Sequence, residues 1–394
     1  MRKIALWLIL PATVALAGDM DGRWDATITS GAAAVPFRLE VTESPARACF
    51  FEDTQPVCSS SAEIKDGTMT ARFDFLNTEL QLTAKDGGLT GSYVSLRGQR
   101  ARPSAIAGKH YQPPAAPAQP PAKLAGEWEV HTKAQTAGNQ LLLQQSGADL
   151  KGTILRVDGD EGTLLGRVDG NHFVISHFSG DRANLMEGTL LADGTLDLTQ
   201  GTAKMIGYRP AAARALSLLA PPDPSTYARA KDPQAKFHFS FPDLNGKTVT
   251  EDAFAGKPYV VTITGSWCPN CRDEAPFLAE LYKTYHTQGL DIVGFCFEYA
   301  DDPTYGPLKA FMRKYGIAYQ MLVAGPPPAR GLGEAIPQVE HISAYPTSIY
   351  VGRDGRIKAV HTGFPSIGSG DELNRVKKEV KTIVEEMLAD KPEK

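Results

Sequence analysis

Short segments in which apolar and polar residues alternate fill most of residues 18–209. Each segment spans only a few residues and ends at a turn that contains glycine, as at 169–171 and 193–194. Alternation with a period of two residues is typical of half-buried β-strands, and helical spacing is nearly absent here. The pattern predicts two small antiparallel β-sandwiches or barrels, one over residues 18–108 and one over residues 124–209.

The two predicted β domains begin with related sequences. Gly22-Arg23-Trp24 opens the first and Gly126-Glu127-Trp128 opens the second, which indicates an internal repeat. Residues 109–123 between them are rich in proline and alanine, a composition that favours extended polyproline geometry and predicts a semi-rigid linker. A second linker is expected over residues 210–233, with a short helix at 211–219.

The pattern changes over residues 234–391. Short apolar runs rich in β-branched residues, such as Tyr259–Thr264, alternate there with segments whose apolar residues have helical spacing. Expected strands are 259–264, 291–297, 319–323, 347–351 and 357–361, and expected helices are 269–285, 308–315 and 372–388. Strands that alternate with helices predict an α/β fold.

Two cysteines lie where the strand 259–264 gives way to the first of these helices. Cys268 stands at the helix N-terminus, where free backbone N–H groups and the helix dipole favour a thiolate. Cys271, one turn later, is placed to attack a mixed disulfide that forms on Cys268 and to release the partner. Pro269 suits the first helical turn because its missing N–H has no partner to lose there. The stretch predicts thiol-disulfide exchange.

Two simpler roles for the cysteine pair remain as alternatives, a zinc site and a structural disulfide. No second C-x-x-C is present, since the other cysteines are Cys49, Cys58 and Cys296, and no His-x-x-x-His follows. A bridge that closes so short a loop constrains the unfolded chain little. His131, together with the histidines at 172 and 177, is expected to be structural or exposed, so neither a metal nor a cofactor is predicted.

Residues 237–388 resemble the TlpA-like thiol-disulfide oxidoreductases, which are redoxin-type members of the thioredoxin superfamily. The motifs that carry this resemblance, in the family's order, are Gly265-Ser266-Trp267-Cys268-Pro269-Asn270-Cys271, Glu274-Ala275-Pro276-Phe277-Leu278, Gly289-Leu290-Asp291-Ile292-Val293-Gly294, Ala344-Tyr345-Pro346-Thr347-Ser348 and Gly352-Arg353-Asp354-Gly355-Arg356-Ile357. The resemblance implies a thioredoxin fold over residues 234–391. It covers roughly the last two-fifths of the chain. Similar β modules precede the redox domain in some exported TlpA-like proteins, so the resemblance implies that the β domains serve in placement or in partner binding.

The resemblance also implies roles for individual residues. Pro346 matches the cis-proline that faces the cysteines, and Glu274 matches an acidic residue that tunes their ionisation. Trp267 is expected to shield the pair. The other implied surroundings of the site are Pro269, Asn270, Tyr345 and Thr347.

The chain also departs from the thioredoxin pattern. Thr262 stands where thioredoxin has a buried acid, which Glu274 is expected to replace. The segment 325–342 is longer than a minimal thioredoxin needs, and it either shapes partner choice or is a solvated loop.

The N-terminus predicts export. Residues 1–17 combine a basic start, an apolar core and an Ala-x-Ala cleavage site, which is the pattern of a secretory signal peptide. The mature protein is therefore expected to be soluble and periplasmic or otherwise exported. In that oxidising setting Cys49 and Cys58, which bracket a turn, predict a structural disulfide. Cys296 lies in an apolar run and is expected to be a buried strand residue.

Composition excludes some classes of partner. The chain of 394 residues has a net charge of −4 and 22% charged residues, without a basic patch for nucleic acid. The expected function is exchange of disulfides with partner proteins, as a reductant served by a redox donor. The alternatives are a peroxiredoxin-like peroxidase and a non-catalytic binding protein that acts through its β modules. The sequence leaves the oligomeric state open.

Overall fold

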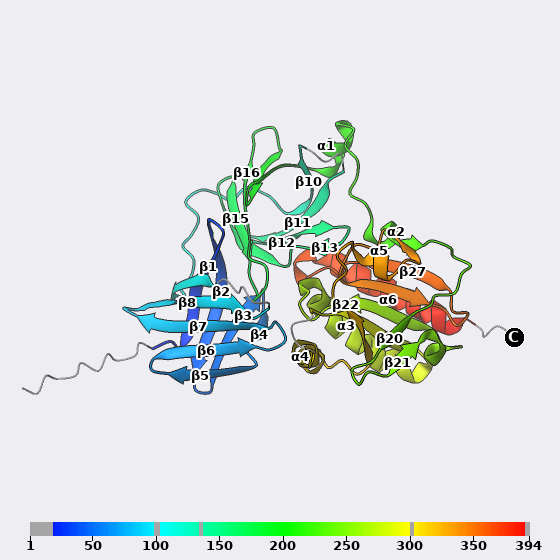
Figure 1. The fold of residues 1–394 in the computed structure, drawn as a ribbon. Coiled ribbons are helices and arrows are strands. Elements are labelled where there is room, and N and C mark those ends of the chain that lie inside the picture. The colour runs from blue at the N-terminus through cyan, green and yellow to red at the C-terminus, as the bar shows by residue number, and fades with distance from the viewer. Residues whose placement is uncertain (1–18, 98–102, 134–136, 300–302, 391–394) are drawn as a thin grey trace, which may run out of the picture.

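The computed structural model describes residues 19–97, 103–133, 137–299 and 303–390. The expected signal peptide, residues 1–17, lies outside the described residues. Figure 1 shows two β-rich domains followed along the chain by an α/β domain, with the second β domain adjoining both of the others. Within the described ranges, no helix is both long and apolar enough to cross a membrane.

The first β domain is one antiparallel sheet of nine strands in the order β4-β3-β2-β1-β9-β8-β7-β6-β5. These strands are β1 (Gly22–Ser30), β2 (Ala33–Glu43), β3 (Ala46–Glu52), β4 (Gln55–Cys58), β5 (Ser61–Lys65), β6 (Thr68–Phe73), β7 (Thr78–Lys85), β8 (Gly88–Ser95) and β9 (Ser104–His110). The first and last strands pair with each other, as in a barrel, but no ladder joins β4 to β5 among the described residues. The sheet is therefore a half-barrel.

The second β domain is a closed antiparallel barrel. Its strands are β10 (Gly126–Thr132), β11 (Asn139–Ser146), β12 (Asp149–Arg156), β13 (Gly159–Asp160), β14 (Leu164–Asp169), β15 (His172–His177), β16 (Asn184–Leu190), β17 (Leu196–Gln200) and β18 (Ala203–Tyr208). Strand β10 pairs with both β11 and β18, and β11 pairs with β12, which closes the ring. The sequence left sandwich and barrel open, and only this domain closes.

The repeated tryptophans play the same part in the two β domains. The Trp24 indole N–H donates to the Met20 carbonyl at 3.0 Å, and the Trp128 indole N–H donates to the Leu124 carbonyl at 2.8 Å. Both rings are fully buried. A buried indole needs a partner for its N–H, and in each domain the residue four positions earlier supplies it, so the sequence repeat is also a structural repeat.

The α/β domain is built on a five-stranded sheet in the order β24-β23-β22-β26-β27. Its strands are β22 (Tyr259–Thr264), β23 (Asp291–Phe297), β24 (Gln320–Gly325), β26 (Thr347–Val351) and β27 (Ile357–Thr362). The first three are parallel to one another, and β26 runs antiparallel to both β22 and β27. A separate hairpin is formed by β20 (Ser240–Pro242) and β21 (Thr248–Thr250).

The two faces of this sheet carry different cover. Helices α3 (Pro269–Tyr285), α4 (Gly306–Tyr315) and α6 (Asp371–Ala389) pack on one face, where Leu278 and Leu281 are buried as their spacing predicts. The other face is covered by the residues around the β20–β21 hairpin and by part of the 325–342 segment. Strands β22 and β23 are covered on both faces, which explains their nearly continuous apolar runs.

The second linker and the 325–342 segment are more ordered than their sequences suggested. The linker contains α1 (Pro210–Ala215), shorter than the expected 211–219, together with α2 (Pro224–Tyr227) and β19 (Arg229–Ala230). The 325–342 segment contains α5 (Leu332–Ala335) and β25 (Val339–Glu340), and β25 pairs with β19. The short strands β19 and β25 thus hold the linker and the 325–342 segment together, so this segment is not a free loop.

One loop of the barrel connects all three domains. Residues 178–183 join β15 to β16, and Phe178 packs against Phe37, Phe50 and Tyr93 of the first β domain. The Tyr93 hydroxyl donates to the Gly180 carbonyl at 2.6 Å. Asp181 of the same loop pairs with Arg272 in the first turn of α3. We call residues 178–183 the bridging loop.

Candidate active site

Cys268 is the N-cap residue of helix α3. Its backbone is extended, and its sulfur accepts a hydrogen bond from the Cys271 N–H at 3.3 Å. Pro269 occupies the first helical position, as its chemistry favours. A sulfur at this position receives both a backbone donor and the positive end of the helix dipole, which favours negative charge on it.

The two cysteines are free thiols and nearly inaccessible. Cys268 is 2% exposed and Cys271 is 1% exposed. The Cys268 thiol also lies 3.3 Å from the Tyr345 carbonyl oxygen, and the Tyr345–Pro346 peptide bond is cis. Burial, with the Cys268 sulfur next in importance, raises the pKa of Cys271 well above the ordinary thiol value. The two sulfurs are therefore chemically unequal, because Cys271 retains its proton.

Glu274 lies under the cysteines, against the sheet. It is 5% exposed, and its carboxylate accepts hydrogen bonds from the hydroxyls of Thr262 at 2.9 Å and Ser348 at 2.7 Å. Burial raises its pKa to about 7, while the two hydroxyls act in the opposite direction. Thr262, at the position of thioredoxin's buried acid, thus donates to Glu274, the residue expected to stand in for that acid. The Glu274 carboxyl group can exchange a proton near neutral pH.

Aromatic rings surround the cysteine pair on one side. The Trp267 indole N–H donates to the Phe297 carbonyl at 2.7 Å, and its ring centroid lies 5.0 Å from that of Tyr345 and 5.4 Å from that of Tyr299. The Thr347 hydroxyl donates to the Ala344 carbonyl at 2.8 Å, which ties down the cis-proline loop. Trp267, Tyr345 and Thr347 therefore lie around the cysteines.

The barrel contacts the dipeptide between the two cysteines. The buried Asn270 side-chain amide donates to the Asp160 carboxylate at 3.1 Å and to the Asp160 carbonyl at 3.3 Å. Asp160 follows Gly159, which approaches Gly363 so closely that a Cβ on Gly363 would lie 2.4 Å from the Gly159 nitrogen. The Asp160 carboxylate also accepts from the Ser366 N–H at 2.7 Å. The β12–β13 turn is thereby held against the α3 N-terminus.

A second contact joins the barrel to Arg272, two residues after Asn270. Arg272 and Asp181 form an ion pair in which the side chains are 7% and 10% exposed. The His177 ring nitrogen lies 3.5 Å from the same Asp181 carboxylate. Because a buried charge without a partner is strongly destabilising, this pair binds the bridging loop to α3.

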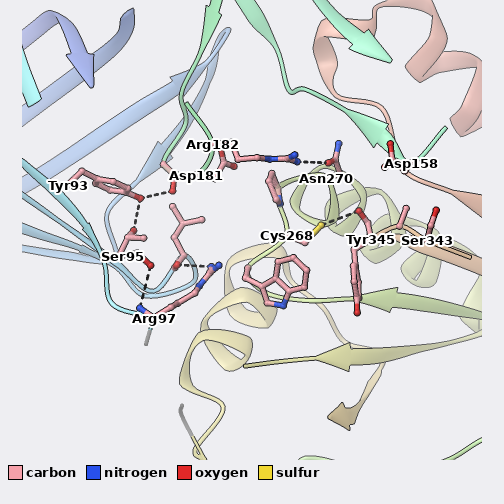
Figure 2. Close-up of a pocket in the computed structure, with 16 residues that line it drawn as sticks. Tyr93, Ser95, Arg97, Asp158, Asp181, Arg182, Cys268, Asn270, Ser343 and Tyr345 are labelled. Atoms are coloured by element: carbon pink, nitrogen blue, oxygen red, sulfur yellow. Dashed lines mark hydrogen bonds between the residues drawn. The ribbon is translucent and has the colours of Figure 1, made fainter. Parts of the chain in front are cut away.

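A cavity of about 500 Å³ lies where the three domains meet, and Cys268 lines it (Figure 2). The first β domain contributes Tyr93 and Arg97, the bridging loop contributes Asp181 and Arg182, and the α/β domain contributes Cys268 and Tyr345. Among the described residues no group of three or more His, Cys, Asp or Glu is arranged to hold a metal ion.

Sequence reasoning named the cysteines, Glu274 and the cis-proline loop but missed the barrel residues. Asp160 lies in the two-residue strand β13 and Asp181 in the bridging loop, and Asp160 is 110 residues from Asn270 along the chain. Arg272 and Asn270 have the spacing of ordinary residues in an exposed first helical turn. The available signal was a charged residue, Arg272, directly after the C-x-x-C motif, which by itself does not indicate a partner.

The remaining cysteines and histidines lie elsewhere. Cys49 of β3 and Cys58 of β4 form a disulfide across their hairpin, with Cα atoms 4.0 Å apart. Cys296 is fully buried in β23, where burial raises its pKa. His172 is exposed and His177 is buried, so the two do not share an environment.

The α/β domain is similar to known proteins. The Redoxin family profile matches residues 230–377. Over 120 residues the chain is 28% identical to the thiol-disulfide oxidoreductase ResA of Bacillus anthracis, which covers 30% of this chain and 63% of that protein. The ResA protein of Bacillus subtilis is 25% identical over 126 residues, covering 32% of this chain and 64% of that protein. The chain thus spans less than two thirds of the length of these relatives.

A solved structure from Chlorobium tepidum TLS, a thiol:disulfide interchange protein of the thioredoxin family, is 24% identical. The superposition covers 41% of this chain and all of the Chlorobium protein, with a TM-score of 0.32. The family match, the C-x-x-C helix start and the sheet order agree with one another. Residues 230–377 are a Redoxin domain with a thioredoxin fold, and two all-β modules precede it.

Proposed function

We propose that this protein is a thiol-disulfide oxidoreductase in which Cys268 is the nucleophile and Cys271 the resolving thiol. The observation that carries the proposal is the inequality of the two sulfurs. Cys268 caps α3 beside the cis-Pro346 loop, whereas Cys271 lies behind it, buried and with a raised pKa. The similarity to ResA supports the same activity.

In the first step the Cys268 thiolate attacks one sulfur of a disulfide substrate. The substrate S–S bond breaks, a mixed disulfide forms on Cys268, and the other substrate sulfur leaves as a thiolate. The Cys271 N–H, 3.3 Å from the Cys268 sulfur, and the helix dipole stabilise the attacking charge.

In the second step Cys271 attacks the Cys268 sulfur and releases the second substrate thiol. Cys271 must first lose a proton, and Glu274 lies one helical turn away with a pKa of about 7. We assign Glu274 the role of accepting that proton directly or through water. Both electrons end on the substrate, and the enzyme ends as the Cys268–Cys271 disulfide.

The direction of exchange and the location form part of the same proposal. We propose that the protein acts as a reductant of partner disulfides in an exported, oxidising compartment, where a redox donor must regenerate the dithiol. The signal-peptide pattern of residues 1–17 and the Cys49–Cys58 disulfide support export.

A trapping experiment tests the cysteine roles. Reduced Cys271→Ser protein mixed with a disulfide substrate should accumulate a stable mixed disulfide on Cys268, detected by mass spectrometry, whereas Cys268→Ser should form none. Cys296→Ala serves as a control and should behave like the wild type. Turnover by the Cys268→Ser variant would contradict the proposal.

The reduction potential of the cysteine pair, measured by equilibration with dithiothreitol buffers, tests the direction. A value near the ~−270 mV of thioredoxin or lower supports a reductant, and one near ~−120 mV indicates an oxidant.

A further inference from the structure

Access to Cys268 is limited by parts of the chain outside the Redoxin domain. The cysteine is 2% exposed and lines a cavity of about 500 Å³ whose walls come from all three domains. That volume lies in the range of small-molecule pockets, about 300–1,000 Å³. A folded partner protein contacts roughly 800 Å² of surface, and a disulfide on such a surface would have to project into the cavity to reach the nearly inaccessible Cys268 sulfur.

The walls of the cavity are fixed in place by direct contacts. Tyr93 of the first β domain donates to Gly180 of the bridging loop at 2.6 Å, and Asp181 of that loop pairs with Arg272 of α3. On another side, Asn270 donates to Asp160 of the barrel at 3.1 Å. These three contacts are buried, so the cavity is a built feature of the three-domain assembly and not a loose gap.

One cation on the wall has unused hydrogen-bonding capacity. Arg182 of the bridging loop is exposed, and toward the residues that the structure describes its guanidinium makes one long hydrogen bond, 3.4 Å to the Asn270 side-chain oxygen (Figure 2). A guanidinium carries five N–H donors and suits a carboxylate. Asp181 nearby is already neutralised by Arg272, and the other acid of the lining is the exposed Asp158.

We infer that the three-domain cavity admits a disulfide carried on a short, extended peptide, with Arg182 binding an acidic group beside it, and excludes disulfides on folded surfaces. This inference rests on the proposed function. The peptide has two sources, a free low-molecular-weight disulfide such as glutathione disulfide or a flexible segment of a larger protein. In either case the Cys268 and Cys271 thiols are oxidised to a disulfide, and the substrate disulfide is reduced to two thiols.

The test compares matched substrates with the reduced full-length protein. The substrates are folded lysozyme, a cystine peptide copied from the strands around its most exposed disulfide, the same peptide with one neutral neighbour of the cystine changed to aspartate, and glutathione disulfide. Second-order rate constants are divided by those for dithiothreitol with the same substrate, which removes intrinsic reactivity and general accessibility.

We expect the normalised rate for the peptide to exceed that for folded lysozyme by about tenfold or more, and the acidic peptide to react about threefold faster than the neutral one. Arg182→Gln should abolish the acidic preference, measured as the ratio of the acidic-peptide rate to the neutral-peptide rate within the variant. Arg23→Gln, which alters an exposed arginine of the first β domain, should leave both rates unchanged. Glutathione disulfide faster than the peptides identifies the free small disulfide as the source, and the reverse identifies a protein segment.

Two results would overturn the inference while the proposed function stands. One is equal normalised rates for folded lysozyme and the peptide. The other is an acidic preference that survives in Arg182→Gln. If the reduced protein exchanges with no disulfide at all, the proposed function fails, and this inference fails with it.

Discussion

The first turn of α3 has two sides, which differ in where their hydrogen-bonding and ionic partners come from. The side facing the sheet carries Cys271 and Glu274, whose partners Thr262 and Ser348 belong to the same domain. The side facing the barrel carries Asn270 and Arg272, whose partners come from another domain. On our proposals, the proton chemistry is therefore local to the Redoxin domain, while control of access to Cys268 depends on the β modules.

Breaking the barrel side should have the largest effect on stability. Arg272→Ala leaves the Asp181 carboxylate buried without its cation, which should lower the free energy of unfolding by about 3–5 kcal/mol. Urea unfolding followed by circular dichroism measures this change. The double variant Arg272→Ala with Asp181→Ala should recover most of the loss.

Arg375→Ala provides the matched control for that prediction. Arg375 pairs with Glu372 and Glu379 on the surface of α6 with about half of its side chain exposed, so its removal should cost less than ~1 kcal/mol. An Arg272→Ala loss as small as this would mean that the barrel is not held to α3 by the ion pair.

The effect of the sheet side should be visible in the pH dependence of the free energy of unfolding. Because the pKa of Glu274 is raised from 4.5 to about 7, the folded state binds more protons than the unfolded state between these values, and stability falls as pH rises through them. Glu274→Gln removes this slope. Relative to the variant, the wild type should lose about 3 kcal/mol between pH 4.5 and pH 8.

Thermal or urea unfolding of both proteins across this pH range makes the measurement. The other buried acids titrate in both proteins and cancel in the difference. A difference that is constant with pH would show that the pKa of Glu274 is the same in the folded and unfolded states. In kinetics, the variant should release its mixed disulfide more slowly than the wild type while forming it at the same rate.

The smallest effect is expected at the contact between the first β domain and the bridging loop. Tyr93→Phe removes the hydroxyl that donates to the Gly180 carbonyl and contacts the Thr78 hydroxyl, at a cost of about 1 kcal/mol. Substrate access should also increase, measured as a higher rate with folded lysozyme. Unchanged stability together with an unchanged rate would show that this hydrogen bond neither stabilises the protein nor limits access to Cys268.

The sheet side was open to prediction from sequence because its signals are local. Cys268, Cys271 and Glu274 lie within seven consecutive positions of a single helix start. The apolar, β-branched run before them predicted the strand β22, and the helical spacing of apolar residues after them predicted α3. The barrel side was not, since Asp160 lies in a strand of two residues and Asp181 in a loop, where no periodicity marks them, and Asp160 is 110 residues from Asn270 in the chain. Contacts between such distant segments depend on how whole domains dock.

The architecture of the β domains shows the same limit. Both have nine strands and pair their first strand with their last, yet only the second closes. In the first, β4 has only four residues and includes Pro56, which lacks the N–H that a ladder requires. The alternation of apolar and polar residues predicted the strands. Closure of the first β domain depends on pairing between the edge strands β4 and β5, which the sequence pattern does not reveal.

The approach of Gly159 to Gly363 has a consequence for how the protein can change during evolution. At that point backbone meets backbone, and a Cβ on Gly363 would overlap the Gly159 main chain. A residue larger than glycine at position 363 would have to displace the Gly159 main chain, and with it the Asp160 that contacts Asn270. The contact between the two domains at this point is therefore set by the main chain, and substitutions of the side chains that line the cavity need not alter it.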